Sequence, residues 1–237
     1  MHKFLLILFI LITNQIIAQE YSSGIITYKK QFIGKMKNPL LKKDRLNESR
    51  AQLNYILKFK SAESLFFLEE KMENDLNRNS ALAKRIGGTS GQYYIDINNQ
   101  TFLQQTEIFS QKFLVMLDEK DYSITKESKN IQGYKCFKAI FKKIEKAPNE
   151  NLKDIESIVE VWFAPELSFP FGPLEYHSLP GLILEVKTNN ITLTATKISL
   201  NKSNFNIERP CDGQELTEKE YMNTLEKIVK NLSREKK

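Results

Sequence analysis

Histidine and cysteine are scarce in this chain of 237 residues, which contains two of each. His2 lies at the amino terminus, so His177 is the only histidine of the remaining chain. Zinc sites in proteins are built from about four ligands, mostly Cys and His at short spacings. Neither HExxH nor any histidine cluster surrounds His177. The sequence therefore predicts no metal site, and a satisfied loop or surface histidine is the simpler interpretation of His177.

Glycine and proline are also few, with nine and seven residues respectively. These contents exclude a fibrous or low-complexity protein. The one glycine-rich stretch is Gly87-Gly88-Thr89-Ser90-Gly91, and no Lys-Ser or Lys-Thr pair follows it. A phosphate-binding P-loop requires that pair. The stretch is therefore interpreted as a connection, and no cofactor is predicted.

Long hydrophobic runs are missing beyond the amino terminus. Met1-His2-Lys3 is a short basic start, residues 4–12 are apolar, and Ala18 offers a small residue for cleavage. This layout is typical of a secretory signal peptide, and a run of about nine apolar residues is shorter than the ~20 that cross a bilayer. We therefore expect a signal peptide at residues 1–18 and a single domain at 19–237. The mature protein is expected in the periplasm or cell envelope, or secreted, and not to be transmembrane after cleavage.

The formal net charge is +6, but no stretch concentrates it. Basic residues are interleaved with acidic ones, as in Lys42-Lys43-Asp44-Arg45. Nucleic-acid binding requires a concentrated basic stripe. No nucleic-acid partner is expected, and weak attraction to anionic lipid head groups remains open.

The two cysteines, Cys136 and Cys211, allow one disulfide in an oxidising compartment. A bridge that closes so long a loop stabilises by about 4 kcal/mol in the chain-entropy model. Cys136 also lies in a strand pattern, where a buried free thiol is the alternative.

Most of the chain shows the patterns of β-strands. Leu53, Tyr55, Leu57 and Phe59 alternate with more polar residues, which is typical of a half-buried strand. The predicted strands are 24–32, 52–60, 63–70, 93–97, 101–104, 113–117, 122–126, 134–144, 157–164, 182–186 and 191–196. Asn98-Asn99 and Asn189-Asn190 predict hairpin turns, because asparagine tolerates positive φ.

The pattern changes near the carboxy terminus. Thr217 and Glu220 have the spacing of a capping box, and apolar residues then recur every three or four positions. The sequence therefore predicts a mainly β (α+β) protein: a single curved antiparallel sheet or open half-barrel with a C-terminal helix. Residues 38–50 are expected to form a short helix or ordered loop, 71–90 an irregular connection and 148–151 a loop.

Four side chains are candidates for acid–base chemistry. Glu160 and Glu185 are predicted on nearby strands, and Glu175 and His177 lie between them. Paired carboxylates can act as general acid and base. Carboxylates on the solvent face, or paired with Lys or Arg, are the simpler interpretation.

Aromatic residues make up 11% of the chain. They fit a hydrophobic core, but an open barrel with apolar residues at its mouth can also hold an apolar ligand. The stretch from Trp162 to Leu182 is rich in proline and aromatic residues and precedes a strongly apolar strand.

This same stretch resembles a known family. Trp162-Phe163-Ala164-Pro165, Phe171-Gly172-Pro173 and Ser178-Leu179-Pro180-Gly181-Leu182-Ile183-Leu184-Glu185 resemble motifs of the GLPGLI family of exported Bacteroidota proteins, and residues 131–139 resemble a second motif. The first glycine of the signature is Ser178 here. The resemblance implies an envelope or secreted location and no established activity. The family's pattern looks like the half-barrel of lipoprotein-carrier proteins.

Three functional hypotheses follow. The first is a binding module for a lipid or other apolar ligand, or for an envelope partner, with a binding rim at Trp162, Phe169, Phe171, Leu179, Pro180 and Gly181. The second is an accessory protein of outer-membrane transport or surface assembly, acting by contact with an outer-membrane protein. The third is a hydrolase that uses Glu160, Glu175, Glu185 or His177.

Overall fold

A computed structural model describes residues 22–34, 53–69, 91–108, 110–145, 155–201 and 205–234. The predicted signal peptide (1–18), the 38–50 segment, the 71–90 connection and the 148–151 loop lie outside the described residues.

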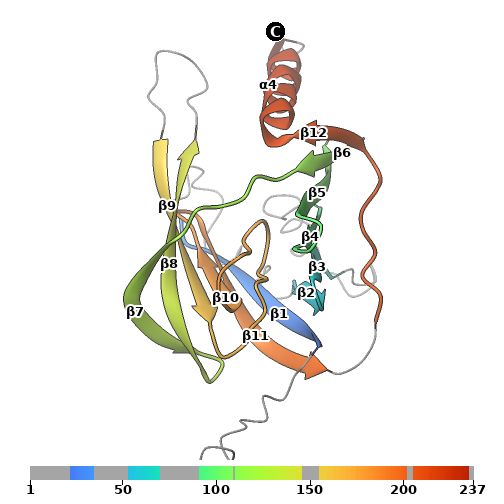
Figure 1. Cartoon of the computed structure of the whole chain (residues 1–237). Coiled ribbons are helices and arrows are strands. Elements are labelled where there is room, and N and C mark those ends of the chain that lie inside the picture. The colour runs from blue at the N-terminus through green and yellow to red at the C-terminus, as the bar shows by residue number, and fades with distance from the viewer. Residues whose placement is uncertain are drawn as a thin grey trace, which may run out of the picture.

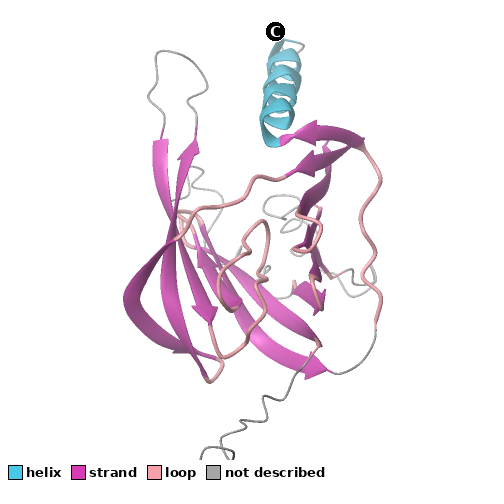
Figure 2. Ribbon diagram, viewed as in Figure 1, coloured by secondary structure: helices cyan, strands magenta, loops and turns pink. Residues whose placement is uncertain are grey.

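The described strands form one open, curved sheet, which confirms the predicted fold class (Figures 1 and 2). The strands are β1 (Ser23–Phe32), β2 (Tyr55–Lys60), β3 (Glu63–Leu68), β4 (Gln92–Asp96), β5 (Thr101–Ile108), β6 (Gln111–Met116), β7 (Ser123–Ile131), β8 (Tyr134–Glu145), β9 (Ile155–Ala164), β10 (Leu182–Lys187), β11 (Ile191–Asn201) and β12 (Gln214–Thr217). Their order is β12-β6-β5-β4-β3-β2-β1-β11-β10-β9-β8-β7. Figure 1 shows the sheet bending so that β7–β9 form one arm and β2–β6 the other.

Strand β1 joins the two arms, because it pairs with β2 on one side and with β11 on the other. Every pairing in the sheet is antiparallel except that of β12 with β6, which is parallel. The sequence did not predict β12. Its four residues, Gln214 to Thr217, are mostly exposed and show no apolar alternation, so no pattern marked them as a strand.

Alternation along the strands sends large apolar side chains to the inner, concave face. In β2 the side chains of Tyr55, Leu57 and Phe59 are fully buried, while Lys58 and Lys60 between and beyond them are partly exposed. The same side of the sheet contributes Phe66 from β3 to the main core. The core therefore lies in the concavity between the two arms.

Both asparagine pairs occupy hairpins, β4–β5 and β10–β11, as predicted. The positive φ angle in the first turn falls on Gln100 (φ 48°) rather than on either asparagine. The turn is held instead by Asp96, whose carboxylate accepts hydrogen bonds from the Asn99 backbone amide (3.1 Å) and side-chain amide (2.7 Å). Asparagine therefore contributes here through its hydrogen bonds and not through its φ angle.

The C-terminal helix α4 (Glu218–Arg234) begins at the predicted capping box. Glu220 donates its amide to Thr217 Oγ1 (3.2 Å), and the Thr217 amide donates to Glu220 Oε2 (2.9 Å). Tyr221 packs edge-on against Phe113 of β6, with ring centroids 5.5 Å apart. The helix extends away from this edge of the sheet (Figure 1). Within the described residues no helix has the length and apolar character that would let it cross a membrane.

Candidate functional site

The inner face of the sheet is occupied by the protein's own loop between β9 and β10, residues 165–181, here called the inner loop. Figure 1 shows it between the two arms. Phe169 and Phe171 of the inner loop pack against Phe59 of β2, with ring centroids 4.5 and 6.0 Å apart. His177 lies over Phe102 of β5 at 4.2 Å. The inner loop therefore bridges the two arms across the concavity.

Backbone hydrogen bonds fix the inner loop in this position. The Ser178 amide donates to Pro170 O (2.9 Å), and the Ile183 amide donates to Phe171 O (2.9 Å). Just beyond the loop, Tyr28 of β1 donates its hydroxyl to Ile183 O of β10 (2.6 Å) in a buried bond. The first bond ties the loop to itself and the second ties it to β10. Because Phe171 and Leu179 are also buried, the loop is part of the core.

The predicted binding rim does not form one surface in the structure. Phe171 (0% exposed) and Leu179 (3%) are core residues, and Gly181 is also buried. Phe169 is half-buried against Phe59, and Pro180 is exposed. Trp162 lies on the opposite, outer face of β9, because its neighbour Phe163 points inward.

Trp162 packs under charged side chains on the outer face. The Lys129 ammonium lies 4.2 Å from the centroid of its ring, a cation–π contact. Lys129 also forms an ion pair with Glu185 at 2.6 Å, and Glu185 accepts a hydrogen bond from Thr194. This arrangement covers the indole with a satisfied charge pair rather than offering it to a ligand.

The candidate carboxylates are not brought together with His177. Glu160 is paired with Lys187 (3.2 Å) and lies near Lys138 (3.7 Å) on the outer face. Glu175 belongs to the inner loop, 4.0 Å from Lys143. Glu160 and Glu185 therefore hold strands together by ion pairing, the simpler of the two interpretations made from the sequence. In the described part of the chain, no group of three His, Cys, Asp or Glu side chains could hold a metal ion.

His177 is a buried histidine, 1% exposed. Its Nδ1 lies 2.7 Å from Ser178 Oγ, and its Nε2 has no hydrogen-bond partner among the described residues. Burial, with the nearby Lys120 ammonium as a smaller cause, lowers the pKa of His177 to about 4. The imidazole is therefore neutral at physiological pH and belongs to the core.

We expect this burial to make folding sensitive to acid. The folded pKa of His177 lies below its ordinary value of 6.5, so the unfolded state binds a proton more readily between pH 6.5 and 4. Stability contributed by the neutral ring is present above pH 6.5 and falls by roughly 3 kcal/mol as the pH drops to 4. Urea unfolding at several pH values, compared between the wild type and His177→Phe, measures this. A variant with the same pH slope as the wild type would contradict the assignment.

Both cysteines are free in the structure, so the Cys136–Cys211 bridge, one of the two alternatives left open by the sequence, is not formed. Cys136 is buried in β8, whereas Cys211 is exposed in the segment before β12. Burial raises the pKa of the Cys136 thiol to about 11. The buried thiol is the alternative that the structure contains.

Alkylation should separate the two thiols. Iodoacetamide added to the native protein near pH 8 should modify Cys211 and leave Cys136 unreacted, because Cys211 is exposed to the reagent whereas Cys136 is buried and its raised pKa keeps it protonated. Both should react after unfolding in guanidinium. Peptide mapping by mass spectrometry reads the result, and a Cys136–Cys211 peptide in the non-reduced sample would show the bridge instead.

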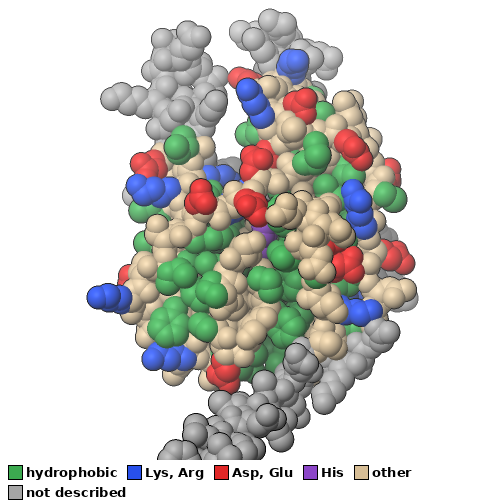
Figure 3. Space-filling model, viewed as in Figure 1, with side chains coloured by type: hydrophobic (Ala, Val, Ile, Leu, Met, Phe, Trp, Pro, Cys, Tyr) green, Lys and Arg blue, Asp and Glu red, His purple; other side chains and the backbone are tan. Residues whose placement is uncertain are grey.

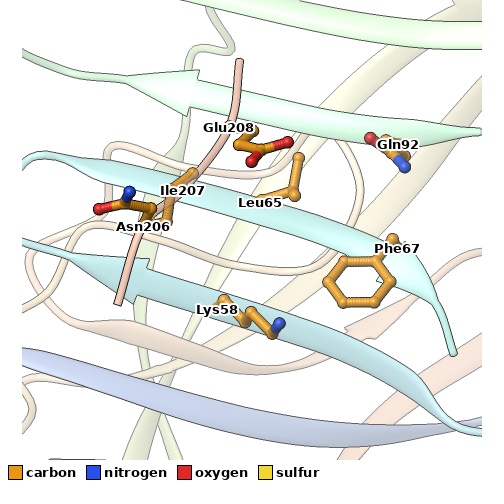
Figure 4. A pocket seen from close by; sticks show the side chains of 7 residues that line it. All are labelled: Lys58, Leu65, Phe67, Gln92, Asn206, Ile207 and Glu208. Carbon is orange, nitrogen blue, oxygen red and sulfur yellow. The ribbon is translucent and has the colours of Figure 1, made fainter. Parts of the chain in front are cut away.

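A hollow of about 270 Å³ lies on the outer face of the arm formed by β2–β6, here called the second arm. Figure 4 shows Glu208 and Gln92 on one side, Lys58 and Phe67 on the other, and Leu65 and Ile207 between them. Gln92, Asn206 and Glu208 are exposed, while Lys58 and Phe67 are half-buried. The hollow combines polar side chains at its rim with apolar side chains at its floor.

The sequence did not predict this hollow. Its residues come from β2, β3, β4 and the segment before β12, so they are distant in the chain. Only the outward positions in the alternation of β2 and β3 indicated that Lys58 and Phe67 face solvent. The crossing of the later segment over these strands is a tertiary contact that no local pattern encodes.

Two solved structures resemble this fold. They are titled "Structure of PNGF-II in C2 space group" and "Structure of PNGF-II in P21 space group", and each superposes with a TM-score of 0.51. Sequence identity is 18% and 19%, over 85% and 86% of this chain. The chain spans about a third of these proteins, 32% and 33% of their length. At this identity the likeness concerns the fold alone.

A protein family also matches the chain. The family of the PNGase F-II N-terminal domain, described as "N-glycanase peptide, N-terminal domain", matches residues 54–220. No curated protein matches the chain. The family match covers most of the described sheet, from β2 to the start of α4, so this chain belongs to the family of N-glycanase N-terminal domains.

Proposed function

We propose that this protein is an exported binding module that holds glycan-bearing proteins at the cell envelope through its outer surface. The observation that carries the proposal is the inner loop. Because Phe171, Leu179 and His177 fill the inner face with the protein's own side chains, recognition has to take place on the outside of the sheet.

The family supports a glycan-bearing partner. Its description names an N-glycanase, and a domain that accompanies such an enzyme meets N-glycosylated protein. The chain covers only about a third of the solved relatives, so we propose recognition for it and carry over no glycanase chemistry. The pairing of Glu160 and Glu185 with lysines agrees with this choice.

The leader pattern at residues 1–18 and the resemblance to the GLPGLI family support the proposed location, the periplasm or cell envelope with release as an alternative. The face in Figure 3 mixes hydrophobic, acidic and basic side chains without a stripe of one charge. The sequence also suggested an apolar ligand. We do not propose one in the concavity, because the inner loop occupies that position.

A second candidate function is that of an accessory protein of outer-membrane transport or surface assembly, acting by contact with a protein. Helix α4 favours it, because Met222 is 62% exposed and the apolar Leu225 and Ile228 are only half-buried. A projecting helix with a partly covered apolar stripe is a common means of protein recognition.

One pull-down experiment separates these functions. The mature protein, residues 19–237, is immobilised and offered one secreted glycoprotein in two forms, intact and after enzymatic removal of its N-glycans. We expect retention of the intact form and loss of retention after glycan removal. Equal retention of both forms would favour the accessory function, and retention of neither would contradict the proposal.

A further inference from the structure

We infer that the outer hollow formed by Lys58, Phe67, Gln92, Asn206 and Glu208 is a binding site for one neutral sugar residue of a glycan. This inference rests on the proposed function and names the site through which it would operate.

The hollow is held open by the chain's own packing. Residues 205–213, here called the strap, cross the outer face of the second arm before β12. Ile207 of the strap packs with the outer-face cluster, whose buried members are Tyr94, Leu103 and Leu114. Because Ile207 is fixed on this cluster, its neighbours Asn206 and Glu208 are carried to the edges of the hollow.

Polar contacts fix the far end of the strap. Asp212 pairs with Lys112 of β6 at 2.6 Å, and its backbone amide donates to Gln105 Oε1 (3.1 Å). The other wall consists of neighbouring strands of the sheet, β2 to β4. Both walls are therefore in place before a ligand arrives, which lowers the entropic cost of binding.

The side chains present the groups that recognise a pyranose. The half-buried ring of Phe67 offers an apolar face to the C–H side of a sugar, and Leu65 and Ile207 extend that floor. Gln92 and Asn206 each supply a side-chain amide that both donates and accepts hydrogen bonds. Glu208 supplies a carboxylate whose two oxygens accept hydrogen bonds. These amides and this carboxylate can form hydrogen bonds with adjacent hydroxyl groups of a sugar.

The polar side chains of the hollow are available for a ligand. Within the described residues, the side chains of Gln92, Asn206 and Glu208 make no hydrogen bond or ion pair to the protein, and the contact of Lys58 is with the Phe67 ring, 5.3 Å from its centroid. The side chains line a common space (Figure 4). A ligand can thus gain several hydrogen bonds there without breaking any within the protein.

Charge and size narrow the ligand class. One lysine and one glutamate nearly cancel, so the hollow favours a neutral ligand over a phosphate or a carboxylate, for which several cations would be expected. A volume of about 270 Å³ lies just below the range of sites for drug-sized molecules, which suits one sugar ring. The lining side chains Gln92, Asn206 and Glu208 are exposed, so the hollow opens at the surface and the remainder of a glycan can continue into solvent.

Amide chemical shifts of the ¹⁵N-labelled mature protein test the inference. The probes are N,N′-diacetylchitobiose and a mannose trisaccharide, each titrated into the millimolar range that one sugar residue is expected to require. We expect saturable shifts concentrated at Lys58, Phe67, Gln92 and residues 206–208. No saturable shift with either probe, or shifts centred elsewhere, would overturn the site.

Single substitutions then show which side chains contribute to saccharide affinity. Phe67→Ala and Asn206→Ala should each weaken binding of the responding saccharide by about tenfold or more, because each removes a direct contact with the sugar. Gln111→Ala on β6 and Asn223→Ala on α4, both exposed and outside the hollow, are matched controls that should leave affinity unchanged. Unchanged affinity in both hollow variants would overturn the inference.

The failure of the site and the failure of the proposed function give different results. If Phe67→Ala and Asn206→Ala retain the intact glycoprotein as well as the wild type does, the proposed function stands and the site is wrong. If the saccharide binds in the hollow but glycoprotein retention does not depend on glycans, the site stands and the proposed function is wrong.

Discussion

Gly181→Val is expected to destabilise the protein by more than about 4 kcal/mol, or to prevent folding, a loss reserved for severe structural conflicts. Gly181 has φ +150°, and a Cβ atom built on it would lie 2.3 Å from Ala164 O and 2.8 Å from Pro165 Cα. These are backbone atoms at the end of β9, where the inner loop begins, so they cannot move aside without disturbing the sheet. Chemical denaturation followed by circular dichroism measures the loss.

The matched control is Gly133→Val in the turn between β7 and β8. Gly133 also has positive φ (+86°), but a Cβ there meets nothing within 4 Å. The free energy of unfolding of this variant should fall by only about 1–3 kcal/mol, the cost of holding a residue with a side chain at positive φ. If the two variants lost the same stability, the close approach at Gly181 would not be the cause.

Phe171→Ala should cost about 3–5 kcal/mol, the range for truncation of a buried phenylalanine. The Phe171 side chain is fully buried and packs against Phe59 of the opposite arm. Its removal therefore leaves a cavity between the arms of the sheet. The same denaturation experiment measures the loss of unfolding free energy.

Phe67→Ala is the control of the same residue type on the outer face. Phe67 is half-buried, so its truncation should cost about 1 kcal/mol from the smaller area removed from water. This variant also removes one wall of the proposed sugar site, and a small loss would show that its effect on binding is not a folding defect. Equal losses for Phe171→Ala and Phe67→Ala would contradict the assignment of the inner loop to the core.

The sequence was informative where a local pattern has one structural solution. The alternation of Tyr55, Leu57 and Phe59 places a buried strand, and the Thr217–Glu220 capping box locates the start of α4. The curved sheet follows from many such strands joined by short turns. The Pro180-Gly181 turn was also predicted to lead into a core strand, and Leu182 and Leu184 of that strand are fully buried. Ser178, just before the turn, has a positive φ of +65°.

Contacts between residues distant in the chain could not be predicted from local sequence patterns. Proline and aromatic residues between β9 and β10 fit an exposed rim as well as a buried loop, and only the packing of Phe171 and His177 across the sheet distinguishes the two. The parallel pairing of β12 with β6 joins residues about a hundred positions apart. The strap before β12 forms the outer hollow through the same long-range return.

The filled inner face is the central claim, and native mass spectrometry of the protein, purified without detergent, tests it most directly. We expect the mass of the polypeptide alone, with no small molecule released on denaturation, because the inner loop takes the place of a ligand. A lipid or other apolar compound that co-purifies in stoichiometric amount and is released on unfolding would contradict the claim.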